Sequence, residues 1–384
     1  MTASIPQENE HDGVPRQDPD RAWTKDLQEA DSHEVRPAEG PDDRGLRQGQ
    51  RAVEWEEASP LAVLYRFADL VLRSEVPLSE LPVAFSGPPE CLFRIRRSER
   101  PEPFHDRWDH HWRSPEGDVV LSCARDGDAY RLGVPGLSTF LIEDGGRAIT
   151  CRPDFTLPPG TLEHLLIDQV LPRVLTHRGR LVIHAGCVVT PQGAIGFLGD
   201  SGTGKSTVCA DFARAGHPLL GDDGIVVRRT ATEAFEAIAT YPGLRLLPDP
   251  LTILFDERAG AAPVAHYTAK RRIDRNHTNL TLAANPQPLR ALYVLDTADE
   301  ITIAPLPERD AFIALVGASF QLHLDDQERS RGLFERIGTL LDAVPVRRLS
   351  YPRDFTRLGA VREALLADAA AVATPASSAG CACS

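Results

Sequence analysis

Eight residues, Gly199 to Ser206, match the pattern G-x-x-x-x-G-K-[ST], whose spacing suits the binding of a phosphate chain. Glycine permits backbone angles that other residues avoid, so consecutive amide groups can turn inward around an anion. The amino end of a following helix adds partial positive charge at the same point. We expect Lys205 to reach the outer phosphates and the Ser206 hydroxyl to bind Mg²⁺. The predicted phosphate-binding residues are Gly199, Asp200, Ser201, Gly202, Thr203, Gly204, Lys205, Ser206 and Thr207.

The residues around this loop have the order of elements that a phosphate loop requires. Residues 193–198 are apolar enough for a buried strand, and residues 206–214 have helical spacing that ends at a glycine cap, Gly216. Only three of the 42 Lys and Arg residues are lysines, and one of them is Lys205. A compact ammonium at this position has a role that a guanidinium does not fill. These features favour a phosphate loop over a chance match.

Two adjacent carboxylates follow the loop helix. Asp222 and Asp223 come directly after a short apolar run, residues 218–220. One could bind a metal ion while the other takes the proton of an acceptor hydroxyl, because like charges this close raise the pKa of one partner. The alternative for the pair is a plain Asp-Asp-Gly turn. Asp296, which ends the apolar run 291–295, is a second candidate for the metal ligand.

The 384-residue chain is acidic, with a net charge of −13, which disfavours non-specific binding to nucleic acid. Residues 1–60 hold 15 acidic and 7 basic residues and show almost no periodic apolar pattern. Such a segment cannot bury enough apolar surface to offset its chain entropy. We therefore predict a disordered, solvating acidic tail over residues 1–58, with a binding arm as the alternative.

The sequence predicts a cytoplasmic protein. Its first ten residues have no basic start and no apolar run, so no signal peptide is expected. No stretch of 18 apolar residues occurs, so no membrane partner is expected either. The seven cysteines are an odd number without a C-x-x-C pair, which suits reduced thiols. A homo-oligomer is left open.

A smaller, antiparallel β-rich domain is predicted over residues 59–179, because short strand-like runs alternate there with Gly, Pro and Asp clusters. The predicted strands are residues 91–96, 119–123, 129–134, 139–142 and 147–151. Residues 161–178 carry leucine and valine at helical spacing, which predicts an amphipathic helix that bridges two domains.

A second domain is predicted over residues 180–368, and a flexible tail over residues 369–384. The predicted strands are residues 180–184, 193–198, 218–220, 225–227, 291–295, 301–304 and 346–350, and the helices are residues 206–214, 309–320, 330–343 and 355–367. Alternating strands and helices after a phosphate loop indicate a sheet covered by helices. The predicted fold class is therefore α/β, with this domain preceded by the β-rich domain and the acidic tail.

A cluster of polar residues in the first predicted domain offers metal-ligand types. Residues 105–111 read His-Asp-Arg-Trp-Asp-His-His. They lack a recognised ligand spacing and lie between proline-rich turns. An ordinary polar loop is therefore favoured over a metal site.

Four elements in register resemble the HPr kinase/phosphorylase family: His184, the phosphate loop, the Ala-Gly-His segment ending at His217, and Asp222-Asp223. In that family a histidine precedes the loop and an R-G-H…A-D-D segment follows it. The spacings are fifteen residues from His184 to Gly199, twelve from Lys205 to His217, and seventeen from Lys205 to Asp222. The close resemblance covers residues 180–227.

Over its whole architecture the chain looks more like the HPr-kinase-like proteins of peptide natural-product gene clusters. Residues 65–81, 178–185 and 349–354 are similar to segments of those proteins. Some members, the lasso-peptide kinases, phosphorylate a serine of a precursor peptide. The resemblance thus implies a phosphate-loop kinase fold, ATP and Mg²⁺ as cofactors, and a peptide or protein substrate that bears a serine.

The resemblance also implies roles for individual residues, with Lys205 among the catalytic ones. Asp222 would be the general base that activates the acceptor serine, Asp223 and Ser206 would hold Mg²⁺, and His184 would sit beside Asp222 and tune its charge. A core histidine at a strand end is the alternative for His184. His217 is expected to pack the end of the loop helix.

The chain departs from the family at one segment. An L-E-I-R-G motif supplies HPr kinases with a further glutamate near the metal, whereas the corresponding residues 241–247 hold no acidic residue, the first being Asp249. The second metal contact and the reverse phosphorylase reaction are therefore not implied. The basic run 270–272 either supplies charge to the phosphates or to an acidic substrate, or is a plain exposed run.

The leading functional prediction is an ATP-dependent kinase acting on a serine hydroxyl of a peptide or protein. A small-metabolite kinase on the same fold and a non-catalytic nucleotide-binding regulator are the alternatives. Two adjacent aspartates favour catalysis, because a switch needs only one metal carboxylate.

Overall fold

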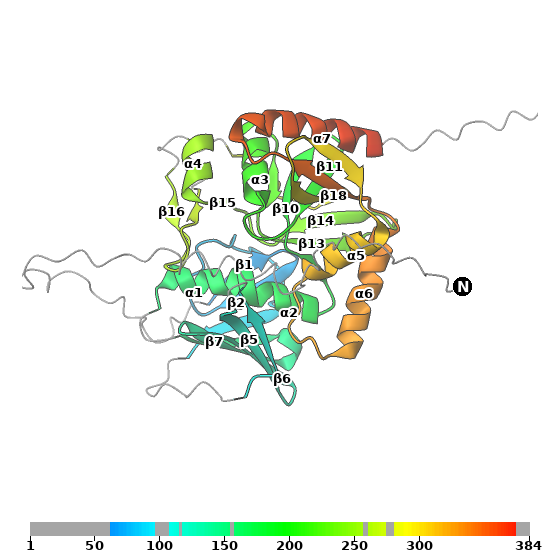
Figure 1. The fold of residues 1–384 in the computed structure, drawn as a ribbon. Coiled ribbons are helices and arrows are strands. Elements are labelled where there is room, and N and C mark those ends of the chain that lie inside the picture. Colours follow the sequence, from blue (N-terminus) through cyan, green and yellow to red (C-terminus); the bar gives the residue numbers. More distant parts are fainter. Residues whose placement is uncertain are drawn as a thin grey trace, which may run out of the picture.

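The computed structural model describes residues 62–96, 107–114, 117–153, 157–255, 260–273 and 280–373. Two main sheets are connected by a long helical segment, giving a mixed α/β architecture (Figure 1). The tail predicted over residues 1–58 lies outside the described residues. So do residues 374–384 of the predicted flexible tail and the first two residues of the 105–111 cluster.

The N-terminal sheet contains eight strands: β1 (Val63–Phe67), β2 (Leu70–Ser74), β3 (Cys91–Ile95), β4 (His110–Arg113), β5 (Val119–Asp126), β6 (Ala129–Val134), β7 (Ser138–Glu143) and β8 (Ala148–Pro153). Their order is β1-β2-β3-β8-β7-β6-β5-β4. The five strands predicted in this region are confirmed. The wholly antiparallel arrangement is wrong, because β3 runs parallel to both of its neighbours, β2 and β8. The connection from β2 to β3 spans residues 75–90. It is long enough to return the chain to the end of the sheet at which β2 began, as a parallel pair requires.

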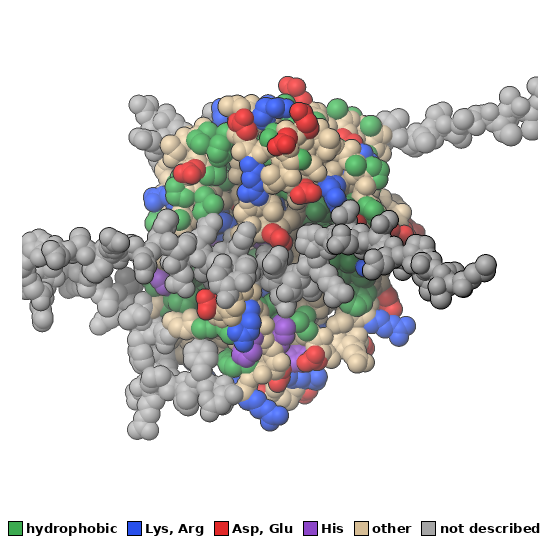
Figure 2. All heavy atoms as spheres, in the orientation of Figure 1, with side chains coloured by type: hydrophobic (Ala, Val, Ile, Leu, Met, Phe, Trp, Pro, Cys, Tyr) green, Lys and Arg blue, Asp and Glu red, His purple; other side chains and the backbone are tan. Residues whose placement is uncertain are grey.

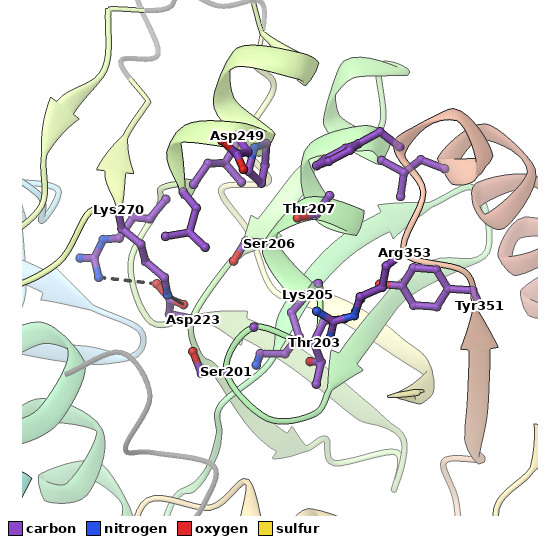
Figure 3. Close-up of a pocket in the computed structure, with 18 of the residues that line it drawn as sticks. Ser201, Thr203, Lys205, Ser206, Thr207, Asp223, Asp249, Lys270, Tyr351 and Arg353 are labelled. Carbon is purple, nitrogen blue, oxygen red and sulfur yellow. Dashed lines mark hydrogen bonds and ion pairs between the residues drawn. The ribbon is translucent and has the colours of Figure 1, made fainter. Parts of the chain in front are cut away.

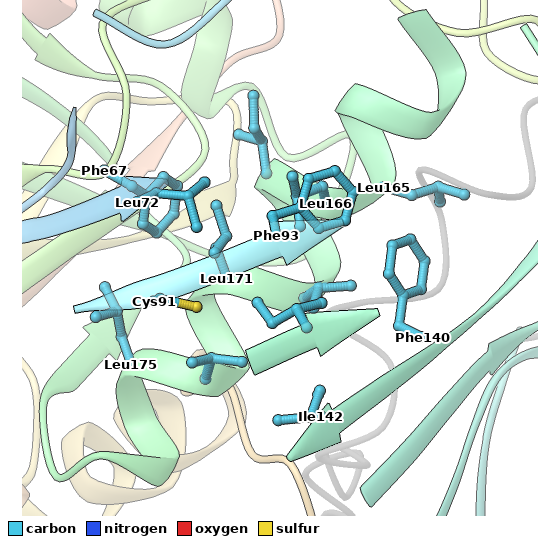
Figure 4. Close-up of a cluster of buried hydrophobic side chains, with 14 of the residues drawn as sticks. Phe67, Leu72, Cys91, Phe93, Phe140, Ile142, Leu165, Leu166, Leu171 and Leu175 are labelled. Atoms are coloured by element: carbon cyan, nitrogen blue, oxygen red, sulfur yellow. The ribbon is translucent and has the colours of Figure 1, made fainter. Parts of the chain in front are cut away.

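The helix predicted over residues 161–178 is present as α1 (Pro159–Leu165), the π-helical turn η4 (Leu166–Val170) and α2 (Leu171–His177). Leu165, Leu166 and Leu171 pack against strand residues such as Phe93 and Phe140 (Figure 4). The amphipathic expectation is only half right, because polar residues of this segment, Glu163, His164 and Arg173 among others, are buried as well. Both sides of the segment are covered, since Val182 and Val226 of the second sheet belong to the same apolar cluster.

The second sheet contains the phosphate loop. Its strands are β9 (Leu181–Ile183), β10 (Gly186–Thr190), β11 (Gly193–Leu198), β12 (Leu219–Gly221), β13 (Ile225–Arg229), β14 (Phe235–Ala239), β18 (Gln287–Thr297), β19 (Thr302–Pro305) and β20 (Val346–Tyr351). The order is β12-β10-β11-β18-β14-β13-β9, with β20 beside β18 and β19 beside β20. Among the neighbouring strands of this sheet, only β11 with β18 and β18 with β20 pair in parallel. The predicted strands are confirmed, whereas β10 and β14 were not predicted.

Helices cover both faces of this sheet. On one face, α3 (Lys205–Arg214) and α7 (Leu358–Ala373) pack on a cluster that includes Phe197 and Tyr293. On the other, α5 (Glu308–Gly317) and α6 (Gln327–Leu341) pack on Leu198 and Leu292. Figure 1 shows α7 across one end of the molecule, with α5 and α6 along one side. The last helix is longer than predicted and runs into the segment predicted as a tail.

A small flap completes the second half. It consists of β15 (Arg245–Leu246), α4 (Pro248–Leu254), β16 (Ala262–Pro263) and β17 (Arg271–Arg272), and its strands pair in the order β15-β17-β16. The flap brings residues of the 241–249 and 270–272 segments next to the loop helix α3.

The cluster at residues 105–111 is only partly the loop that was predicted. His110 and His111 begin β4, and His111 Nδ1 lies 2.8 Å from the Ser122 hydroxyl of the neighbouring strand. The alternating in-and-out positions of a strand explain how histidines can occupy it. No group of three His, Cys, Asp or Glu side chains in the described part of the chain is placed to hold a metal ion.

On the face shown in Figure 2, Lys and Arg side chains are interspersed with Asp and Glu over both sheets. None of the described helices is long and apolar enough to span a bilayer. Five cysteines within the described ranges, Cys91, Cys123, Cys151, Cys187 and Cys209, are buried free thiols.

Candidate active site

The phosphate loop connects β11 to α3 and is shaped by glycines in the left-handed region. Gly199, Gly202 and Gly204 have φ angles of 141°, 74° and 102°. A Cβ added at Gly204 would lie 2.4 Å from the Tyr351 hydroxyl, which itself donates a hydrogen bond to the Thr203 carbonyl at 3.1 Å. Glycine is therefore required at position 204 both by its backbone angle and by the close approach of β20.

Lys205 is buried and folds back onto its own loop. Its Nζ donates to the carbonyl oxygens of Gly199 at 2.7 Å and Asp200 at 3.0 Å. The Thr203 hydroxyl also donates to the Asp200 carbonyl, at 2.7 Å. The ammonium thus lies within the curve of the loop, from which it can exchange these carbonyls for phosphate oxygens.

A cavity of about 290 Å³ opens over the amino end of α3. Its walls combine loop residues with Asp223, with Lys270 and Asp249 of the flap, and with the connection from β20 to α7. In Figure 3, Asp223 lies between Lys270 and Ser206, while Arg353 and Tyr351 lie on the opposite side of the loop. Concave sites of this kind, with few convergent polar groups, are typical ligand sites. Ser201 and Gly202 to Thr207, from the predicted phosphate-binding set, line this cavity.

Topology explains why Asp222 and Asp223 reach the phosphate loop. β10 is antiparallel to both β11 and β12, so β11 and β12 run in the same direction. Their carboxyl ends therefore emerge at the same edge of the sheet, where ligands of open α/β sheets bind. The carboxylate pair and the loop are thus brought to one site, although 17 residues separate Lys205 from Asp222.

Asp222 is the more deeply buried member of the pair, with 1% of its surface exposed. Its Oδ2 accepts a hydrogen bond from the backbone N–H of Arg245 at 2.9 Å. Burial raises the pKa of Asp222 to about 7, with a further increase from the Asp223 carboxylate. Lys270, the Arg245 amide and the Ser206 hydroxyl all act to lower this pKa, which places the Ser206 hydroxyl close to Asp222.

Asp223 lines the cavity and contacts three groups. Its Oδ2 accepts a hydrogen bond from the Tyr241 hydroxyl at 2.9 Å and lies 3.6 Å from Arg245 Nη1. Its Oδ1 lies 3.9 Å from Lys270 Nζ. Of the basic run, Lys270 therefore faces the site, and Arg272 Nη1 lies 3.2 Å from Glu80 Oε1, so the run is not simply exposed.

His184 follows β9 and lines the same cavity as Asp223. Its backbone N–H donates to the Ala318 carbonyl at 2.8 Å, and its ring packs edge-on against Phe320. These contacts fix the ring beside the phosphate loop. Its pairing with Asp222 remains a prediction. His217, by contrast, packs against Phe212 at the end of α3, as expected.

Asp296, the rival metal ligand, lies on the other flank of the loop. It is exposed, and its Oδ1 accepts a hydrogen bond from the adjacent Thr297 N–H at 2.8 Å. It lines a separate pocket of about 180 Å³, together with Gly199, Asp200 and His184. The larger cavity therefore contains the predicted metal ligands Ser206 and Asp223, and Asp296 lines only the smaller one.

Sequence reasoning missed the supporting residues of this site. Arg245 and Tyr241 contact the carboxylate pair from the stretch that was aligned with the L-E-I-R-G motif, and Tyr351 supports the loop from β20. An arginine and a tyrosine four residues apart gave no signal of their own, because their partners are distant in sequence. Asp249, the first acidic residue after that stretch, does line the cavity.

Comparisons with known proteins find structural resemblances alone. No protein-family model matches the chain, and no curated protein matches it. Among solved structures, the HPr(Ser) kinase/phosphatase from Coxiella burnetii is similar at 14% sequence identity, over 50% of this chain and 93% of that one, with a TM-score of 0.25. These values show a distant likeness over half of the chain. The roles of the site residues are therefore argued from the geometry described above.

Proposed function

We propose that the chain is an ATP-dependent kinase that transfers the terminal phosphoryl group to a hydroxyl group. One observation carries this proposal: the phosphate loop and Asp223 line one cavity, and Asp222, the buried neighbour of Asp223, is not itself among the lining residues. Lys205 and Ser206 line it from the loop, and Asp223 lines it from the end of β12. Phosphoryl transfer requires this combination of positive charge, metal ligands and a base, whereas nucleotide binding alone requires only the loop.

The residues present fit a magnesium–nucleotide complex. The loop has the left-handed glycines that let backbone amides converge on phosphates. The Ser206 hydroxyl and the Asp223 carboxylate are the hard oxygen ligands that Mg²⁺ prefers, and these two residues would hold it. The Oδ1 atom of Asp222 is buried and accepts no well-formed hydrogen bond within the described part of the chain. When bound, Mg²⁺ would neutralise part of the negative charge of the phosphates.

Lys205 and Asp222 then have distinct tasks. Lys205 exchanges its two loop carbonyls for oxygens of the outer phosphates and stabilises the charge of the transferring group. Asp222 takes the proton of the acceptor hydroxyl, for which a pKa near neutral is well suited. His184 lines the same cavity as Asp223, and in this proposal it adjusts the charge of Asp222.

The two aspartates differ in exposure, with 1% for Asp222 and 8% for Asp223. An acceptor hydroxyl therefore meets Asp223 first, and contact with Asp222 requires the site to tighten around its substrates. Catalytic hydrogen bonds are commonly long in the free enzyme and shorten in the complex. A reversed division of labour, with Asp223 as the base, is the specific alternative that this exposure favours.

The acceptor that we propose is a serine of a peptide or protein. Its support is the resemblance of residues 65–81, 178–185 and 349–354 to HPr-kinase-like proteins of peptide clusters, and not the lining of the cavity. A small-metabolite acceptor would use the same machinery.

The test is phosphoryl transfer from labelled ATP to candidate peptides encoded near the gene, read by mass spectrometry. Asp222→Asn should lower turnover by about a thousandfold and preserve Mg-ATP affinity, as expected for loss of a base. Asp223→Asn should instead raise the Mg²⁺ concentration needed for half-maximal rate. If Asp223→Asn abolished turnover and Asp222→Asn raised the Mg²⁺ requirement, Asp223 would be the base and Asp222 the metal ligand. Tight Mg-ATP binding without transfer to any hydroxyl acceptor would replace the kinase by a nucleotide-binding regulator.

A further inference from the structure

Arg245 is completely buried and contacts both members of the carboxylate pair. Its backbone N–H donates to Asp222 Oδ2 at 2.9 Å, and its guanidinium Nη1 lies 3.6 Å from Asp223 Oδ2. The guanidinium also lies 4.4 Å above the ring of Tyr241, whose hydroxyl donates to the same oxygen of Asp223. One residue thus sets the position of one aspartate with its main chain and of the other with its side chain.

Two further carboxylates bind the guanidinium, one at each of its terminal nitrogens, and the nitrogen that faces Asp223 is one of these two. Arg245 Nη2 donates to Glu80 Oε2 at 2.7 Å, and Nη1 donates to Asp168 Oδ2 at 2.5 Å. The side chains of Glu80 and Asp168 are only 4% and 12% exposed. The planar guanidinium has its donors in a fixed fork, so two anchored ends determine its orientation.

The anchors come from outside the phosphate-loop sheet. Glu80 lies in the connection between β2 and β3 of the N-terminal sheet, and Asp168 lies in the π-helical turn η4. The Glu80 segment is itself attached to the helical segment, because the Glu80 N–H donates to Glu163 Oε1 at 2.6 Å. Three distant parts of the chain therefore meet at Arg245.

Stability alone does not explain this arrangement of buried charges. Removing charges from water carries a desolvation penalty for each ion, and apolar residues of similar volume commonly stabilise a core at least as well. The groups nevertheless stay charged: burial raises the pKa of Asp168, but Arg245 and His164 outweigh that effect and hold it below its usual range. A charged network kept buried against a carboxylate pair suits the fixing of geometry.

We propose that Arg245 is the positioning residue of the Asp222–Asp223 pair, and that Glu80 and Asp168 fix its guanidinium from outside the phosphate-loop sheet. The inference rests on the proposed function, because the pair is its site. It assigns the N-terminal sheet a part in setting Mg²⁺-dependent nucleotide binding and turnover without touching substrate. Partners that orient metal ligands in this way are typically worth about 10- to 100-fold in metal affinity or activity.

The main test compares Glu80→Gln with Glu90→Gln in the full chain. Glu90 also lies in the N-terminal half and pairs with an arginine, but with Arg178, whose Nη2 lies at 3.2 Å, and not with Arg245. Affinity for a fluorescent ATP analogue is measured with Mg²⁺ and with EDTA, beside kcat and the thermal midpoint. Glu80→Gln should lower kcat and the Mg²⁺-dependent affinity about tenfold, and leave the affinity in EDTA unchanged. Equal behaviour of the two folded variants would overturn the proposal.

A second test remains informative if Glu80→Gln fails to fold. Tyr241→Phe removes the hydroxyl that donates to Asp223 and keeps the ring beneath Arg245. It should reduce the same Mg²⁺-dependent affinity, and its effect should be less than additive with that of Asp168→Asn. Asp368→Asn, which breaks the pair with Arg347 Nε at 2.8 Å, is the additive control. Additivity of Tyr241→Phe with Asp168→Asn would overturn the proposal.

These measurements separate the two claims. A wild-type chain without phosphoryl transfer contradicts the proposed kinase, yet the Mg²⁺-dependent affinity still shows whether Glu80 acts on the pair. An active wild-type chain whose Glu80→Gln variant matches Glu90→Gln contradicts only the positioning role.

Discussion

Two strand ends that carry carboxylates flank the phosphate loop. The carboxylates of one are buried among other side chains, and the carboxylate of the other is exposed. Asp222 and Asp223 follow β12, are almost fully buried, and contact Arg245 and Tyr241. Asp296 is the penultimate residue of β18, is exposed, and accepts a hydrogen bond from its own neighbour in sequence, Thr297. Both flanks have an acidic residue at the carboxyl edge of the sheet.

The difference teaches that two aspartates at the ends of strands beside one phosphate loop can have very different surroundings. What separates the flanks is the set of groups around each carboxylate. On the β12 flank, buried groups donate hydrogen bonds to both aspartates, and a cavity of about 290 Å³ gives access to Asp223. On the other flank, the smaller pocket is bordered by α5 and contains neither Lys205 nor Ser206. Burial and contacts with other side chains, more than position in the sheet, therefore distinguish the two flanks, and they are the reason for proposing the β12 flank as the site.

The largest effect expected from this comparison follows the substitution Lys205→Ala. Lys205 lines the larger cavity only, so kcat/KM for phosphoryl transfer should fall by roughly a hundred- to thousandfold, as for the loss of a preorganised electrostatic donor. Steady-state kinetics and circular dichroism check the rate and the fold. Retention of most activity by a folded variant would mean that the chemistry does not take place in this cavity.

The next effect concerns the shape of the loop. Gly204→Ala combines a φ of 102° with a Cβ 2.4 Å from the Tyr351 hydroxyl, and should weaken nucleotide affinity about tenfold, a cost of the order of 1–3 kcal/mol. Gly202→Ala is the matched control, because it has a φ of 74° but no atom within 4 Å of the added Cβ. Tyr351→Phe should partly restore Gly204→Ala. Calorimetry of nucleotide binding measures all three, and equal losses at the two glycines would exclude the role of β20.

A third effect appears in the stability of the metal-free protein. The pKa of Asp222 is raised to about 7, so between about pH 4 and 7 the folded state holds a proton that the unfolded state releases. The free energy of unfolding therefore falls as pH rises through this range. Asp222→Asn, which carries no charge, should be more stable than the wild type at pH 8 in EDTA, by a few kcal/mol at most, and should differ little at pH 4.

Denaturant titrations at the two pH values measure this difference. Asp296→Asn serves as the control, because Asp296 is exposed and should show no comparable gain at pH 8. A gain of the same size at both positions would remove the distinction in burial between the flanks.

The smallest effect is expected for Asp296→Asn in the activity assay. If the comparison is correct, kcat and the Mg²⁺ dependence should change by less than about twofold, as is usual for a surface substitution away from special features. A large rise in the Mg²⁺ requirement would instead make the flank of β18 the metal-binding one.

Local patterns predicted much of this site from the sequence. The loop, its preceding strand and its following helix were predicted because their signals lie within 25 residues of one another. Asp222 and Asp223 were singled out because a short apolar run precedes them. Most strands of both sheets were found for the same reason, since alternation and turn residues are local properties.

The parts that were missed depend on contacts between distant residues. Glu80 and Asp168 lie 165 and 77 positions from Arg245, and no local pattern connects them. The parallel setting of β3 is likewise decided by where the chain returns, which propensity does not encode. β10 and β14 escaped notice because they are five-residue strands whose small or charged residues weaken the strand signal.

The apolar cluster around α1, η4 and α2 has a practical consequence. It contains Phe93 and Leu165 from the first half of the chain and Val182, Val226 and Phe320 from the second, so it crosses the boundary near residue 180. A fragment cut there would leave half of this cluster open to water on each piece, with a strong tendency to aggregate. The two halves therefore cannot be exchanged independently, and any engineering of this chain has to retain them as one unit.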